Sequence, residues 1–189
     1  MPDSTDQQLV DRVLSGNKAA FNLLVLRYQH RVAALVSRFV KDPQEAEDVC
    51  QEAFIKAYRA LSLFRGESAF YTWLYRIAVN TAKNHLVSRN RRPPATDVEL
   101  NDLENTESAA VLQDMETPES LLATEKLKQA INQAIEDLPE DLKTAFTLRE
   151  FSGLSYEDIT EVMDCPVGTV RSRIFRAREA IDKKIRELL

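Results

Sequence analysis

Residues 154–181 read LSYEDITEVMDCPVGTVRSRIFRAREAI, and their pattern indicates two helices joined by a tight turn. Ser155, followed three residues later by Asp158, is typical of a helix N-terminus and predicts a short helix over residues 156–163. Residues 164–167 form the turn, and a longer helix is predicted from near Gly168. We therefore predict a helix-turn-helix motif from Tyr156 to Glu179.

The second helix of this motif has an apolar side and a basic side. At about 100° per residue, the apolar stripe consists of Val170, Ile174, Ala177 and Ile181. A solvated basic face would account for any single Arg, but it leaves Phe175 exposed opposite the core without a reason. In a DNA major groove, an aromatic edge can meet a thymine methyl, while Arg pairs with guanine or phosphate. The candidate residues for reading duplex DNA are Arg171, Ser172, Arg173, Phe175 and Arg176.

The rest of the chain is also predicted to be helical. Gly is scarce, at 4 of 189 residues, and Val and Ile rarely alternate with polar residues. Capping and breaking residues predict four helices in the first half, over residues 5–16, 17–40, 42–61 and 68–87, with Asn17 capping the second. Three or four helices follow from residue 117, divided near residues 138, 153 and 166. The predicted fold class is all-α.

Charge divides the chain into three parts. Residues 1–92 hold 14 Lys and Arg against 9 Asp and Glu, whereas residues 93–120 hold 8 acids and no base. Residues 121–189 are mixed, with 11 basic and 13 acidic side chains. This pattern predicts two small helical domains, residues 1–92 and 121–189, joined by a flexible acidic linker over residues 93–120. We expect the two domains to collapse towards each other, or to be clamped by a regulator, when the chain is free.

The fourth predicted helix and the loop before it combine aromatic rings with cations. Residues 64–75 contain five aromatic side chains. Rings stack on unpaired bases, cations follow the phosphates and an amide reads a base edge, so this composition suits single-stranded DNA. An aromatic-rich helical core is the competing interpretation, against which the helix-turn-helix on the same chain argues. The candidate contacts on this helix are Thr72, Trp73, Arg76, Asn80 and Lys83.

The third predicted helix carries a run of acidic residues inside an otherwise basic block. DNA would repel such a face, so a basic protein partner suits it better, although a merely solvated acidic face remains an alternative. The residues concerned include Asp48, Gln51 and Glu52.

Several segments resemble a known family. Residues 48–54 (DVCQEAF) and 70–80 (FYTWLYRIAVN) resemble region 2 of the extracytoplasmic-function (group 4) sigma factors of the sigma-70 family. Residues 138–140 (LPE), 154–159 (LSYEDI) and 167–173 (VGTVRSR) resemble region 4, and the match is to the envelope-stress members of that family. Housekeeping sigma factors carry adjacent tryptophans where this chain has Trp73 and Leu74, which implies weaker promoter melting.

The resemblance implies a transcription factor that binds core RNA polymerase and directs promoter-specific initiation, on an envelope or extracytoplasmic stress regulon. Asp48, Gln51 and Glu52 would dock on the coiled coil of the β′ subunit, and the C-terminal domain would meet the β flap. Phe64 and Asn80, with Arg65 beside them, would hold an unpaired base of the −10 element. The C-terminal candidates would read the −35 element as duplex. The implied regulator is an anti-sigma factor, often anchored in the membrane.

Other classes of function find little support. No P-loop, GxSxG, HExxH or metal-ligand cluster is present, so we expect no enzyme, no metal and no cofactor. Cys50 and Cys165 lie far apart and are expected to be reduced thiols. Without a signal peptide or an apolar span, a cytoplasmic location with no membrane insertion is expected. The main alternative is a helix-turn-helix regulator that binds DNA without polymerase. It explains neither the aromatic side chains of residues 64–75 nor the acidic run on the third predicted helix.

Overall fold

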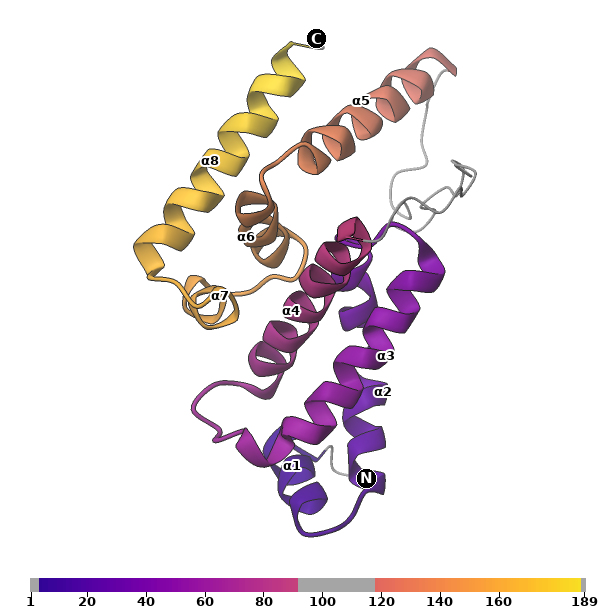
Figure 1. Cartoon of the computed structure of the whole chain (residues 1–189). Coiled ribbons are helices and arrows are strands. Elements are labelled where there is room, and N and C mark those ends of the chain that lie inside the picture. Colours follow the sequence, from indigo (N-terminus) through magenta and orange to yellow (C-terminus); the bar gives the residue numbers. More distant parts are fainter. Residues whose placement is uncertain (1–3, 92–117, 188–189) are drawn as a thin grey trace.

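The computed structural model describes residues 4–91 and 118–187, and Figure 1 shows two helical units. Within these residues the secondary structure is eight α-helices and one 3-10 helix without any strand, which confirms the all-α prediction. The predicted linker lies almost wholly outside the described residues. Its last positions, 118–120, lie at the start of a helix.

The N-terminal unit, residues 4–91, is a bundle of four helices, three of which begin or end as the sequence predicts. Thr5 and Gln8 form a capping box, and the Asp42 carboxylate accepts bonds of 2.9 Å from the backbone N–H groups of Gln44 and Glu45. The elements are α1 (Asp6–Leu14), α2 (Ala19–Val36), α3 (Pro43–Ala60), the 3-10 helix η1 (Leu61–Leu63) and α4 (Phe70–Arg91).

Three boundaries differ from prediction. Helix α2 ends at Val36 instead of near residue 40, and residues 37–39 form a turn. Asn17 is not the cap of α2: Lys18 precedes the helix, and its side chain makes no capping bond. Gly16, at φ +102°, turns the chain so sharply that Lys18 is already helical, and the helix starts without a side-chain cap. Helix α4 extends to Arg91 instead of ending near residue 87, because no helix-breaking residue occurs before Pro93.

The C-terminal unit, residues 118–187, contains the predicted helix-turn-helix. Its elements are α5 (Pro118–Glu136), α6 (Glu140–Glu150), α7 (Tyr156–Met163) and α8 (Val167–Arg186). Helix α7 has the predicted bounds, with a capping box between Ser155 and Asp158, and Asp164 ends it in the left-handed conformation at φ +50°. The predicted apolar stripe of α8 is buried in full: Val170, Ile174, Ala177 and Ile181.

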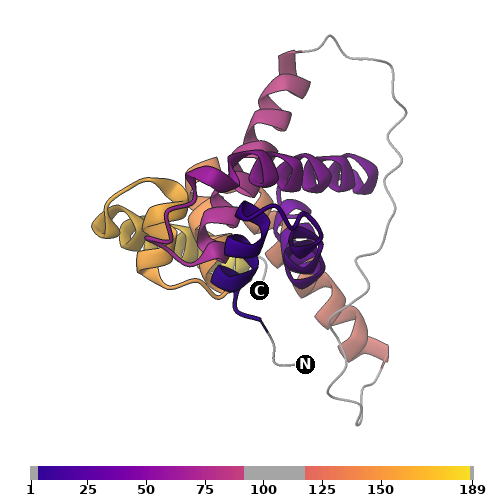
Figure 2. The same ribbon diagram turned by 90° about the horizontal axis from the view of Figure 1, so that it is seen from below.

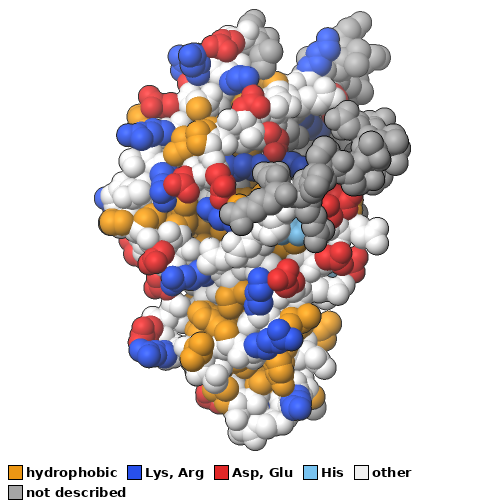
Figure 3. Space-filling view, viewed as in Figure 1, with side chains coloured by type: hydrophobic (Ala, Val, Ile, Leu, Met, Phe, Trp, Pro, Cys, Tyr) orange, Lys and Arg blue, Asp and Glu red, His pale blue; other side chains and the backbone are white. Residues whose placement is uncertain are grey.

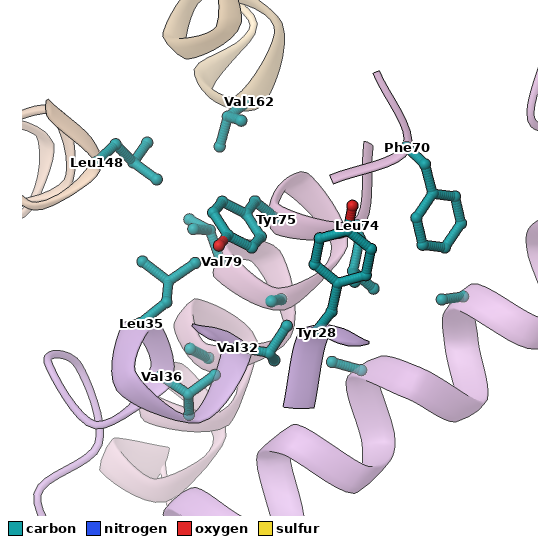
Figure 4. Packing of buried hydrophobic residues seen from close by; sticks show 14 of the residues in the cluster. Tyr28, Val32, Leu35, Val36, Phe70, Leu74, Tyr75, Val79, Leu148 and Val162 are labelled. Carbon is teal, nitrogen blue, oxygen red and sulfur yellow. The ribbon is translucent and has the colours of Figure 1, made fainter. Parts of the chain in front are cut away.

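The two units pack against each other, with α4 against α7 (Figures 1 and 2). One continuous cluster of buried apolar residues runs through both. Figure 4 shows Leu148 and Val162 of the C-terminal unit directed towards Tyr75, Val79 and Leu35 of the N-terminal unit. In the part of the chain that the structure describes, no helix is both long and apolar enough to cross a membrane.

Candidate nucleic-acid interfaces

The aromatic residues before and at the start of α4 form a compact cluster. The ring of Phe64 lies 5.7 Å from that of Phe70 and 5.3 Å from that of Trp73, measured between centroids. Phe70 is buried, whereas Phe64 and Trp73 are half-buried. The sequence left two interpretations open, a surface for unpaired bases and an aromatic-rich core. Features of both are present, because the cluster packs on the core and still offers two ring surfaces to solvent.

The predicted −10 contacts on α4 form a polar arc, which is divided between solvent and the C-terminal unit; it consists of Thr72, Trp73, Arg76, Asn80 and Lys83. Asn80 and Arg76 are exposed, as is Arg65 in the loop before the helix, but Thr72 is only 1% exposed. Its hydroxyl donates a 2.9 Å hydrogen bond to the Asp158 carboxylate, and the Tyr71 hydroxyl donates to the other oxygen at 3.1 Å.

Two cations of the arc also face carboxylates of the C-terminal unit. Arg76 pairs with Asp164 at 3.5 Å, and Lys83 pairs with Glu140 at 3.0 Å and with Asp141 at 3.8 Å. A shallow hollow of about 630 Å³ opens beside the first of these pairs. Figure 3 shows basic and acidic side chains mixed over this face of the molecule.

Asp158 is the carboxylate most closely surrounded. Partial burial opposes its ionisation, but hydrogen bonds from Ser155, Thr72 and Tyr71 outweigh that effect and hold its pKa below the usual range. Asp158 therefore has two tasks, because it closes the capping box of α7 and joins that helix to α4.

The basic side of α8 remains open. Arg171, Ser172 and Arg176 are exposed, and 62% of the Phe175 surface is accessible on the side away from the buried stripe. An aromatic ring exposed between guanidinium groups on a helix-turn-helix is suited to base edges and phosphates of duplex DNA.

Arg173 differs from the other predicted duplex-reading residues. It is half-buried, pairs with Asp141 at 2.5 Å and also lies 3.4 Å from the Cys165 sulfur. The side chain is held against α6 and the turn before α8. Its guanidinium therefore serves the packing of the unit and is less available to DNA than those of Arg171 and Arg176.

The acidic residues of α3 lie at the surface. Asp48, Gln51 and Glu52 are exposed, and Glu52 pairs with Lys56 one turn later at 2.8 Å. Next to them is a groove of about 580 Å³ between α2 and α3, whose lining includes Val25, Ala33, Ala46, Cys50 and Phe54. Burial and the neighbouring Glu47 raise the pKa of the Cys50 thiol to about 11.

The apolar groove was not predicted from the sequence. A signal was present, because α2 carries apolar residues on more than one side, including Leu23 and Leu26, which are exposed. An apolar helix face that the fold leaves uncovered is typical of a protein-binding surface.

Comparison with known proteins identifies the two units. Residues 24–92 match the family model of sigma-70 region 2, and residues 128–181 match that of sigma-70 region 4. The chain is 65% identical to the RNA polymerase sigma-H factor of Pseudomonas aeruginosa over 184 residues, which cover 97% of this chain and 95% of that protein. It is 63% identical to the ECF RNA polymerase sigma-E factor of Escherichia coli over 185 residues, covering 98% and 96%. This chain belongs to the sigma-70 family of sigma factors.

The predicted family membership and function are thereby confirmed: this sigma factor directs transcription initiation and is not an enzyme. Solved structures agree on the fold. CnrH, in complex with the cytosolic domain of CnrY, aligns with a TM-score of 0.68 at 24% identity, covering 95% of this chain and 96% of CnrH. RpoE of Bartonella quintana, in complex with the anti-sigma factor NepR, aligns with a TM-score of 0.64 at 22% identity, covering 88% and 96%.

Proposed function

We propose that this sigma factor uses three separate surfaces, one for polymerase and two for promoter DNA. The N-terminal unit would bind core polymerase and the unpaired −10 strand, and the C-terminal unit would bind the −35 duplex. The observation that carries the proposal is the open basic side of α8, with Phe175 exposed opposite a fully buried apolar stripe. The ring lies on the same side as Arg171 and Arg176, a combination that suits base edges and phosphates in a major groove.

For the −35 element, the proposed readers are four exposed residues on the basic side of α8. An Arg that makes a bidentate contact to guanine is worth about 1–3 kcal/mol of discrimination against other bases. Arg173 would support them from the side, because its pair with Asp141 fixes the start of α8 against α6. The proposed readers are Arg171, Ser172, Phe175 and Arg176.

For the −10 element, we assign the aromatic cluster and the arc of α4. Phe64 and Trp73 offer ring surfaces for unpaired bases, and Asn80 offers an amide to a base edge. Arg65, Arg76 and Lys83 would hold phosphates, and Thr72 would donate to one of them.

For polymerase, we assign the acidic face of α3 together with the adjoining groove. Asp48, Gln51 and Glu52 offer carboxylates and an amide to basic residues of a partner, and the groove offers apolar area. The proposed partner is the β′ coiled coil, with the β flap meeting the C-terminal unit. The solved relatives with bound regulators support control by an anti-sigma factor, which we place at the inner membrane while the sigma factor acts in the cytoplasm on an envelope-stress regulon.

Run-off transcription with purified core polymerase tests this assignment. A promoter library randomised at the −35 element is transcribed by the wild type, by Arg176→Ala and by Lys183→Ala. Arg176→Ala is expected to alter which sequences are used, whereas Lys183→Ala lowers all transcripts evenly or not at all. An unchanged sequence preference for Arg176→Ala would refute the role of α8.

A further inference from the structure

Carboxylates of the C-terminal unit occupy the positions where the proposed −10 contacts would need phosphates. We call this set the acidic rim, and it consists of Glu140, Asp141, Asp158 and Asp164. The rim contacts three of the assigned −10 residues, namely Thr72, Arg76 and Lys83. Each contact is between a cation or hydroxyl of α4 and an anionic oxygen, which is the chemistry of a phosphate contact.

The buried contact shows that rim and DNA exclude each other. The Thr72 hydroxyl is 1% exposed and points to Asp158, so no phosphate can reach it until α7 moves away. A phosphate approaching Arg76 or Lys83 would also meet the rim carboxylates, because these lie within 4 Å of both cations. Like charges at that separation repel, so the strand and the rim compete for one face of α4.

The contact between the units combines an apolar part with a polar part. Its apolar part joins Leu148 and Val162 to Tyr75 and Val79 (Figure 4). Its polar part is extended at the end of α2, where the guanidinium of Arg38 lies 3.8 Å from the centroid of the Phe151 ring. Beside it, Lys41 pairs with Glu136. Interfaces with this balance between units of one chain resemble transient protein–protein interfaces.

The other DNA face is untouched by this contact. The proposed −35 readers on α8 stay exposed while α7 covers α4. While the two units are in contact, which we call the closed chain, the protein can bind a −35 duplex but cannot bind a −10 strand. Only separation of the units makes both faces available.

Resting on the proposed function of α4, we propose that the acidic rim is an intramolecular competitor of the −10 strand and keeps the free sigma factor closed. The apparent affinity for the strand is then the intrinsic affinity multiplied by the open fraction. Core polymerase, by holding the units apart, would release the face of α4 at the promoter.

The test compares two variants of equal charge. The rim variant carries Glu140→Gln, Asp158→Asn and Asp164→Asn. The control variant, Glu125→Gln, Asp182→Asn and Glu187→Gln, removes three exposed acids of the same unit away from α4. The probe is a fluorescein-labelled single strand of about a dozen nucleotides that carries the −10 element shared by the promoters of the run-off experiment. Anisotropy gives its affinity for each full chain, and small-angle X-ray scattering gives the radius of gyration.

If one chain in ten is open in the wild type, the rim variant binds the strand about tenfold more tightly, while the control stays within about twofold of the wild type. The radius of gyration rises for the rim variant alone, and the affinity for a −35 duplex is the same in both variants. Equal strand affinities for rim and control variants would overturn the competition. Should the triple variant fail to fold, the double variant Glu140→Gln with Asp164→Asn leaves the capping box of α7 intact and gives the same test, with a gain expected above the twofold range of the control. Asn suits the left-handed position of Asp164.

Failure of the proposed function is separately visible. Asn80→Ala is added to the rim variant, and strand binding is expected to weaken. If it does not, α4 is not the reader of the strand, whereas the comparison of rim and control variants still decides the competition.

Discussion

The Thr72 hydroxyl donates a hydrogen bond to the carboxylate of Asp158, 86 residues further along the chain. Thr72 lies on the face of α4 assigned to unpaired DNA, and Asp158 closes the capping box of α7, the first helix of the helix-turn-helix. A single contact thus links the two halves of promoter recognition, and it has to break before the −10 face of α4 becomes accessible.

Charge reversal on α3 is expected to weaken binding to core polymerase. The double variant Asp48→Lys and Glu52→Lys places like charges against a basic partner, which lowers affinity by about tenfold or more. Binding is measured by titrating labelled sigma factor with core enzyme. The matched control, Glu125→Lys with Asp182→Lys, should bind as the wild type does, and equal affinities of the two variants would remove α3 from the polymerase surface.

Asn80→Ala is expected to relax the choice of base at one position of the −10 element. Loss of the amide removes about 1–3 kcal/mol of discrimination at that position, while phosphate contacts are unaffected. Transcription from promoters varied at each −10 position measures the effect, with Asn22→Ala on the exposed surface of α2 as the control. Uniform weakening on every promoter would show that Asn80 does not read a base.

Two adjacent residues of α8 separate folding from reading. Ile174→Ala empties a buried site and should lower the free energy of unfolding by about 2–5 kcal/mol. Phe175→Ala, at the exposed neighbour, should change it by about 0.5 kcal/mol or less and yet weaken binding to the −35 duplex. Denaturant unfolding and duplex titration measure the two quantities. A large loss of stability with Phe175→Ala would mean that the ring serves the fold.

Acid is expected to separate the units. Hydrogen bonds from Lys143 and Lys41 outweigh burial and lower the pKa of Glu136, as those from Ser155, Thr72 and Tyr71 do for Asp158. The bonds from Lys41, Thr72 and Tyr71 cross between the units, so their part of the lowering belongs to the closed chain. This stabilisation of closure is present above the usual carboxyl pKa values of about 4 and is lost as the pH falls through the lowered values.

The measurement is the radius of gyration between pH 7 and pH 3, with circular dichroism reporting that the helices persist. Expansion below about pH 4 is expected in the wild type. In Glu136→Gln with Asp158→Asn the change over this range should be smaller. If that variant expands as steeply as the wild type, the expansion comes from the overall charge of the chain and not from Glu136 and Asp158.

Local signals in the sequence predicted the helix-turn-helix well. The Ser155 capping box, the turn at Asp164 and the apolar stripe of α8 all depend on residues within a few turns of one another, and the structure has each where predicted. The start of α2 was missed because Gly16 turns the backbone so that Lys18 is already helical, and no side-chain cap is needed.

The burial of Thr72 and the groove between α2 and α3 could not be predicted in this way. Helical periodicity places Thr72 on a face of α4, but only the packing of the other unit decides whether that face meets water or Asp158. The groove likewise arises from the spacing of two helices, to which residues such as Val25 and Phe54 contribute from separate segments.

The most direct test of the account is footprinting of an intact duplex promoter by the full chain, with and without core polymerase. The account predicts protection of both the −35 and the −10 elements only when polymerase is present, with at most weak −35 protection by the free sigma factor. Strong protection of both elements by the free chain would contradict it, because a closed sigma factor cannot offer the two faces together and a free-standing regulator can.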